Sequence, residues 1–266
     1  MCMFAAMLAA VDVKFGTFAG VDFRSANITR GTIVNPEPIQ CFTGGMNMTL
    51  GTPDDPLGAN ALGGRVWTCN HLTDKRDHQM ERYFNETDPF LYLRNRYLFA
   101  EGWASMTEAG PCWVLYRPFK GEAETPFPEV EWRVRQELDT PWITPYFYLR
   151  HTFKPYSLTY WQTGLKRTLD VADKVSVMPF TFLDWGDDNL FAFKYGESRG
   201  HLDGGVSSLD VGVRGDWRIN GFFSAWLQVE GYWLVNAKAR AANRDRASVT
   251  SRNEIAVVSF GVTFDF

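Results

Sequence analysis

Residues that could carry out catalysis are few in this sequence, and none stands in a catalytic spacing. The histidines lack both the HExxH spacing of zinc hydrolases and a partner in a GxSxG nucleophile motif. They are His71, His78, His151 and His201. Solvent-exposed positions explain them better than ligand roles do. We therefore expect a protein that is not an enzyme and that has no resident metal or cofactor.

The acidic cluster of Asp184, Asp187 and Asp188 contains the oxygen ligands that divalent cations prefer. The surrounding DWGDDN stretch lacks the glycine-punctuated pattern of a calcium loop, so we favour a solvated outer loop. The cysteines show no CxxC spacing, which argues against a thiolate metal site. Cys41 and Cys69 fall on strands that we expect to be adjacent. A cross-strand disulfide is one interpretation, and two apolar thiols that face lipid or the barrel wall are the favoured one.

Composition points to strands and away from nucleic acid. The chain has 266 residues, 27 of them Lys or Arg and 31 Asp or Glu, with a net charge of -4. This balance argues against a nucleic-acid partner. Aromatic residues make up 15%, beside 23 Gly and 13 Pro, which favours strands and turns. No run of about 18 apolar residues exists, which excludes a transmembrane helix, but the strands of a membrane barrel need only about 9 to 11 alternating residues each.

The strongest pattern in the sequence is an alternation with a period of two. In 207–219, Ser208 and other polar or small residues alternate with Leu209, Val211 and Trp217. The same alternation covers 11–24, 129–137, 223–235 and 256–266. A helix would repeat its apolar positions near 3.6. The polar parity is often charged or small, as in a wetted lumen, and the apolar parity carries aromatics towards strand ends, as in the interfacial girdles of membrane barrels.

We predict an all-β fold: a transmembrane, antiparallel, up-and-down β-barrel of 12 strands. The expected strands are 11–25, 38–50, 61–71, 88–99, 104–117, 129–138, 142–153, 156–168, 173–184, 205–219, 222–236 and 254–266. One side then has the links 51–60, 100–103, 139–141, 169–172 and the tight turn Asn220-Gly221, mostly short. The other side has 26–37, 72–87, 118–128, 185–204 and 237–253, with one short turn at 154–155. Short periplasmic turns and long outer loops are typical of outer-membrane barrels.

The organisation is that of one domain with a short leader. Residues 1–10, MCMFAAMLAA, have the apolar run and small residues of the end of a signal peptide without its basic start. We expect cleavage near Ala10 and a single barrel domain over 11–266; a ragged apolar terminus is the alternative.

The predicted pore lining consists of charged residues on the inward parity. It comprises Arg24, Arg94, Arg96, Glu129, Glu131, Arg133, Arg135, Glu137, Lys166, Asp210, Arg214, Asp216, Arg218 and Glu230. If these charges segregate, their field selects ions and polar solutes. If they pair across the lumen, they form a plug that only stabilises the barrel.

Two stretches resemble known families. The C-terminal GVTFDF, with Phe264 and Phe266, resembles the terminal strand of bacterial outer-membrane proteins. That resemblance implies recognition by the barrel-assembly machinery through these two residues. The segment 18–45, with Arg30-Gly31, Pro38 and Gln40, is similar to the first hairpin of TorF-type porins. It departs from them in carrying VDFR where a Tyr-rich strand is usual, and the resemblance implies an outer-membrane channel.

The favoured function is a porin-like channel in the bacterial outer membrane for passive diffusion of small polar solutes or ions. One alternative is a non-conducting outer-membrane barrel whose outer loops bind a partner, a glycan or a lipid. A soluble ligand-binding β-barrel is the third. Expected partners are outer-membrane lipid and lipopolysaccharide, whose phosphates would suit the basic last loop with Arg240, Arg244, Arg246 and Arg252.

Overall fold

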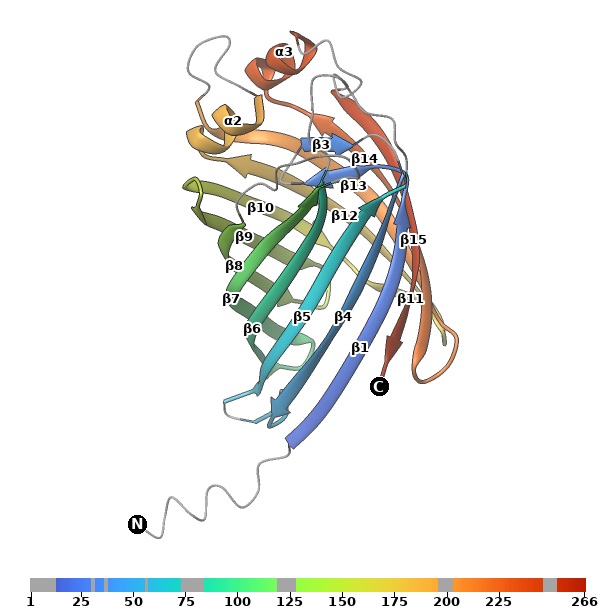
Figure 1. Ribbon diagram of the computed structural model, residues 1–266. Coiled ribbons are helices and arrows are strands. Elements are labelled where there is room, and N and C mark those ends of the chain that lie inside the picture. Colours follow the sequence, from blue (N-terminus) through green and yellow to red (C-terminus); the bar gives the residue numbers. More distant parts are fainter. Residues whose placement is uncertain are drawn as a thin grey trace, which may run out of the picture.

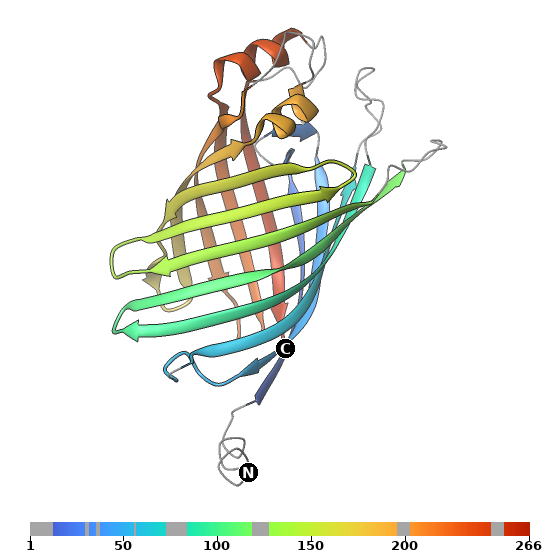
Figure 2. The ribbon, with the colours of Figure 1, turned by 90° about the vertical axis from the view of Figure 1, so that its left-hand side faces the viewer.

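The computed structural model shows a closed antiparallel barrel of 12 strands (Figures 1 and 2). It describes residues 13–29, 32–35, 38–55, 57–72, 84–118, 128–195, 203–245 and 253–266. The barrel strands are β1 (Val13–Arg24), β4 (Ile39–Leu50), β5 (Ala59–His71), β6 (Phe84–Ala100), β7 (Trp103–Pro118), β8 (Glu129–Asp139), β9 (Thr144–Lys154), β10 (Leu158–Lys166) with β11 (Leu169–Ala172), β12 (Val175–Gly186), β13 (Gly205–Arg218), β14 (Phe223–Leu234) and β15 (Glu254–Asp265). Each of the 12 predicted spans overlaps one of these strands, with bounds that differ by up to four residues, so the predicted strand number and order are confirmed.

One predicted link is part of a strand. Residues 169–172 form β11, which pairs with β12 below β10 and continues the same barrel strand. The turn itself lies at Asp173 and Lys174. The predicted signal-peptide remnant, 1–10, lies outside the described residues.

The barrel closes where its first and last strands pair. β1 runs antiparallel to β15, with Phe18 opposite Asp265 and Arg24 opposite Ser259. Beyond the strand, the backbone of Phe266 exchanges two hydrogen bonds with Thr17, of 2.7 and 2.9 Å. Closure pairs the backbone of both terminal strands, which leaves no open sheet edge.

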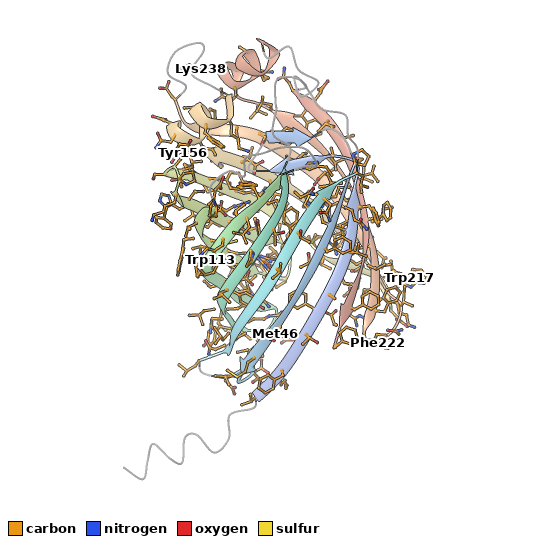
Figure 3. All side chains as sticks on the ribbon, in the orientation of Figure 1. Met46, Trp113, Tyr156, Trp217, Phe222 and Lys238 are labelled. Carbon is orange, nitrogen blue, oxygen red and sulfur yellow. The ribbon has the colours of Figure 1, made fainter. Side chains whose placement is uncertain are left out.

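The apolar parity of the strands forms the outer surface. Val13, Val211, Leu227 and Val258 are between 44% and 53% exposed. A soluble barrel would bury these side chains in its interior. The side chains at the outside of the barrel in Figure 3 include the labelled Met46, which is 66% exposed. This surface matches the predicted contact with lipid.

Aromatic rings gather at both ends of this apolar surface. At the periplasmic end, exposed rings include Trp217 and Phe222, both labelled in Figure 3. Trp142 and Phe266 are exposed as well, and Phe222 stacks on Phe266 at 6.4 Å. At the outer end, exposed Tyr156 and Phe193 lie 5.6 Å apart. Such girdles are found where the barrel wall meets the membrane interfaces.

Connection lengths sort by side as predicted, and the outer side holds additional structure. A small hairpin, β2 (Asn27–Thr29) and β3 (Thr32–Asn35), lies in the first outer connection. Two helices, α2 (Asp188–Tyr195) and α3 (Ala237–Asp245), stand at the same end of the barrel (Figure 1). Sequence periodicity had indicated only loops at these places. Within the residues described, neither helix is long and apolar enough to cross a bilayer.

Candidate pore

Buried carboxylates hold the wall of β6, β8 and β9 together. Glu131 is fully buried and accepts hydrogen bonds from Arg133 (2.9 Å) and Arg150 (2.8 Å) through one oxygen, and from Thr152 (3.2 Å) through the other. Arg133 also reaches Asp88 on β6 at 2.6 Å. Charge-assisted bonds of this kind offset the cost of desolvating both partners.

Two further carboxylates each hold two cations. Glu108 binds Arg94 at 2.5 Å and Arg65 at 3.2 Å. Glu137 pairs with Arg135 and, at 2.6 Å, with Lys166. The two cations of Glu108, which lies on β7, come from β6 and β5. The two cations of Glu137, which lies on β8, come from β8 itself and from β10. Each carboxylate therefore links strands of the same wall.

All the ion pairs named above run along the wall. Their partners sit on one strand, on neighbouring strands, or two strands apart, as Arg133 and Asp88 do. Of the two arrangements considered for the lumenal charges, pairing is thus present, but it is lateral. None of these pairs crosses from one wall to the opposite one, so none of them plugs the lumen.

Two adjoining cavities occupy the interior. The larger measures about 640 Å3. It is lined by Phe18–Asp22 and Arg24 on β1, by Thr43 on β4, and by residues of β5, β8, β13, β14 and β15. The smaller measures about 240 Å3 and lies towards the outer end. Arg24, Gln228 and Glu230 line both cavities, so the two are contiguous.

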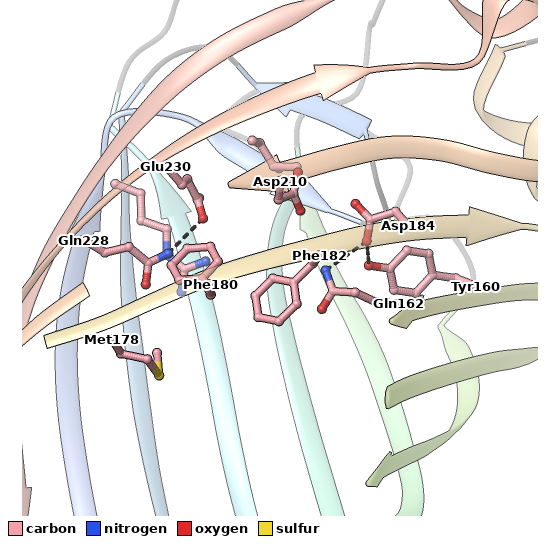
Figure 4. Close-up of a pocket in the computed structure, with 11 residues that line it drawn as sticks. Tyr160, Gln162, Met178, Phe180, Phe182, Asp184, Asp210, Gln228 and Glu230 are labelled. Carbon is pink, nitrogen blue, oxygen red and sulfur yellow. Dashed lines mark hydrogen bonds between the residues drawn. The ribbon is translucent and has the colours of Figure 1, made fainter. Parts of the chain in front are cut away.

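Asp184 organises the wall of the smaller cavity (Figure 4). It is fully buried and accepts hydrogen bonds from Gln162 (2.9 Å), Ser208 (2.6 Å) and Tyr160. The expectation that it belongs to a solvated outer loop is wrong, because β12 continues to Gly186 and turns this side chain inward. Asp187, three residues further on, instead accepts the backbone N–H of Leu190 and caps α2.

The helix α2 covers part of the outer mouth. Its Leu190 is buried against Tyr160 and Tyr148, both on the inward parity of their strands. Its Phe191 packs with Tyr232, Leu234 and Ala239, and Ile28 of the first outer hairpin joins the same cluster. The α2 part of the connection at 185–204 therefore packs against inward-facing side chains of the barrel.

The predicted lining residues divide into three groups. Arg24, Arg135, Arg214 and Glu230 line the larger cavity, and Asp210 lines the smaller one. A second group belongs to the wall. The ion pairs described above involve Arg94, Glu131, Arg133, Glu137 and Lys166. Glu129 accepts a hydrogen bond from Tyr116 at 2.8 Å. Arg96 and Arg218 are exposed near the short-turn end, and Asp216 binds Arg214 at 2.7 Å. Arg65 was missed, although its parity on β5 matches that of Cys69.

Among the residues that the structure describes, no group of cysteines, histidines and carboxylates could hold a metal ion. Cys41 and Cys69 lie opposite each other in the β4–β5 register as free thiols, buried with Ile39 and facing inward. The expectation that the two thiols lie against the barrel wall is confirmed. The expectation that they face lipid is wrong. His71 is buried at the end of β5, so the expected solvent-exposed position is wrong for this histidine. His78 and His201 lie outside the described residues, as do the side chains of Arg244, Arg246 and Arg252.

The closed barrel, its apolar exterior and its charged interior define the chain as an outer-membrane β-barrel. No protein-family model matches the sequence, and no curated protein matches it either. Among solved structures, the chain is similar to an outer membrane channel from Pseudomonas putida F1, with a TM-score of 0.53, 9% identity, and coverage of 94% of this chain and 95% of that one. The KdgM porin aligns with a TM-score of 0.46 and 8% identity over 94% of this chain and 99% of its own. At these identities the likeness concerns the fold alone.

Proposed function

We propose that the protein is a porin-like channel of the bacterial outer membrane, through which small polar solutes or ions diffuse passively. The observation that carries the proposal is the pair of contiguous cavities inside a wall whose ion pairs are lateral. A lumen lined by water-exposed guanidinium and carboxylate groups suits hydrated solutes.

The size of the barrel supports a narrow passage. Barrels of eight strands enclose little more than side chains, and those of sixteen to eighteen strands leave broad channels. Twelve strands, with α2 over part of the mouth, suit a small conductance. The likeness of the fold to a channel and to porins agrees with this proposal, and so does the resemblance of 18–45 to TorF-type porins, which remains a resemblance of one hairpin.

Conductance of the purified full chain in planar bilayers tests the proposal. We expect discrete current steps. Replacing Thr43, which lines the larger cavity, by Trp should lower the unitary conductance, because the ring would occupy part of the passage. The matched control is Phe42→Trp at the neighbouring position, whose side chain is 41% exposed on the outer surface. It should leave the conductance unchanged.

A silent protein that is folded in the bilayer would overturn the channel and favour the non-conducting alternative. One feature supports that alternative. The outer end of the barrel has a folded structure of α2, α3 and the β2–β3 hairpin, which packs around Phe191. Lipopolysaccharide and the barrel-assembly machinery remain proposed partners, the first through exposed basic groups such as Lys238 of α3, and the second through Phe264 and Phe266.

A further inference from the structure

Four arginines from well-separated strands converge on the larger cavity. Arg24 comes from β1, Arg65 from β5, Arg135 from β8 and Arg214 from β13. In the order of strands around the barrel no two of these are neighbours. Their side chains are 34%, 28%, 34% and 28% exposed, respectively. We call these four residues the arginine ring.

Each guanidinium of the arginine ring lies over an aromatic ring of the wall. The distances from Cζ to the ring centroid are 4.3 Å for Arg214 over Trp226 and 4.7 Å for Arg65 over Phe90. They are 5.9 Å for Arg135 over Tyr146 and 6.0 Å for Arg24 over Trp67. A cation over an aromatic face is attracted to it. This contact holds each guanidinium against the wall, and the N–H groups that its carboxylate partner does not bind stay available to a solute.

The carboxylates that balance the arginine ring lie mostly behind it. Glu108, the partner of Arg65, is 2% exposed, and Glu137, the partner of Arg135, is 9% exposed. Neither lines the cavity, and neither does Asp216, which at 35% is as exposed as its partner Arg214. Two of the pairs therefore turn their positive end towards the lumen. This asymmetry favours a positive potential within the larger cavity.

Three carboxylates do line the larger cavity. Asp22 is bound by Arg24 at 2.7 Å and is 12% exposed. Asp265 lies opposite Phe18, nearer the periplasmic end of β1. Glu230 accepts a hydrogen bond from Gln228 at 2.8 Å. Among the described contacts, neither Asp265 nor Glu230 has a guanidinium hydrogen-bonded to it, and Glu230 lines both cavities together with Arg24.

We propose that the arginine ring is a binding and selection site for small anionic solutes with carboxylate or phosphate oxygens. Guanidinium groups bind both kinds of oxyanion through paired N–H donors. The inference rests on the proposed channel function for transport, but anion accumulation at the ring does not require current. Glu230 opposes the selection.

The first measurement is the reversal potential of the full chain in a planar bilayer under a KCl gradient. Wild-type protein should pass chloride in preference to potassium. The double variant Arg65→Gln, Arg135→Gln should lower the chloride-to-potassium permeability ratio by roughly threefold or more, because two lumenal charges are lost. We expect the double variant to fold, because each buried carboxylate retains a cationic partner: Arg94 for Glu108 and Lys166 for Glu137. Glu230→Gln should raise the ratio. Arg167→Gln, at an exposed position between β10 and β11, is the matched control and should leave it unchanged.

The second measurement does not depend on conduction. Trp226 lies under Arg214, so the difference in fluorescence between wild type and Trp226→Phe reports on the ring. Iodide should quench this component more strongly than caesium, by about twofold or more. A third measurement does require conduction and compares citrate with inorganic phosphate as blockers of the chloride current. Stronger block by citrate assigns carboxylate solutes, and stronger block by phosphate assigns phosphorylated ones.

The outcomes separate the two proposals. Current steps that prefer potassium, together with equal quenching by iodide and caesium, would overturn the arginine ring and leave the channel standing. Silent bilayers with preferential quenching by iodide would overturn the channel and support the ring. Chloride preference without block by either oxyanion would refute the binding site.

Discussion

Glu131 shows how a single carboxylate can set the stability of the wall. Its two oxygens accept from Arg133, Arg150 and Thr152, and its side chain is fully buried. Removing one partner of a buried pair leaves an uncompensated charge, which costs far more than the pair contributes in net terms.

We therefore expect Glu131→Ala to lower the free energy of unfolding by about 3 to 5 kcal/mol. Urea titration of the protein in detergent micelles, followed by tryptophan fluorescence, measures this loss. The control is Asp203→Asn, which removes the exposed pair of Asp203 and Lys238 and should cost about 1 kcal/mol or less. Equal effects of the two substitutions would contradict the buried network.

At the scale of the strand, some glycines lie where the neighbouring strand leaves no room for a Cβ atom, and others do not. A Cβ built on Gly110 of β7 would lie 1.9 Å from the carbonyl oxygen of Leu91 on β6. A backbone atom cannot move aside as a flexible side chain can, so the strands themselves would have to separate. At Gly215 of β13, nothing lies within 4 Å of the same Cβ.

Gly110→Ala should destabilise the barrel by about 1 to 3 kcal/mol, because the added methyl overpacks the β6–β7 contact. Gly215→Ala should change the stability by no more than about 0.5 kcal/mol. Two measurements give the difference in stability. One is the midpoint of the urea transition, and the other is the temperature at which the band of the folded barrel disappears on SDS gel electrophoresis. A tolerant Gly110 would show that β6 and β7 are not as close as described.

Strands were predictable from this sequence to a greater extent than the structures between them. Alternation identified all twelve strands because lipid outside and water inside impose opposite demands on successive side chains. Helices α2 and α3 are short, at eight and nine residues, and offered no clear periodicity. Their starting signals were present, since Asp187 and Asn236 each accept the N–H three residues on.

The charged residues of the lumen were predictable by parity, but their partners were not. Sequence spacing suggested pairs within one strand, such as Asp22 and Arg24, which are indeed bonded. The pairing of Arg133 with Asp88 depends on the tilt and stagger of three strands, which composition does not fix. Asn220-Gly221 was expected to form a tight turn, and here the Asn220 side chain accepts the N–H of Phe222 and Phe223.

For the whole molecule, the outer surface distinguishes a membrane barrel from a soluble one. Val229 lies midway along β14 and is 44% exposed. We expect Val229→Arg to lower the stability in lipid vesicles by about 2 to 4 kcal/mol, and Phe222→Arg, in a periplasmic turn, by about 1 kcal/mol or less. Urea titrations in vesicles give both values. If this outer surface faced water and not lipid, Val229→Arg would cost almost no stability.

The lateral ion pairs are not distributed evenly around the circumference. Glu108, Glu131 and Glu137 tie strands β5 to β10 to one another, whereas the pairs Asp22–Arg24 and Arg214–Asp216 each stay within one strand. Among the described contacts, one half of the cylinder is thus cross-braced by ion pairs, and the other has its backbone ladder and the neutral donors that bind Asp184. Under a pulling force, the braced hairpins should leave the bilayer together in large steps. The unbraced ones should peel away singly, so the molecule is mechanically a stiff half-shell joined to a pliant one.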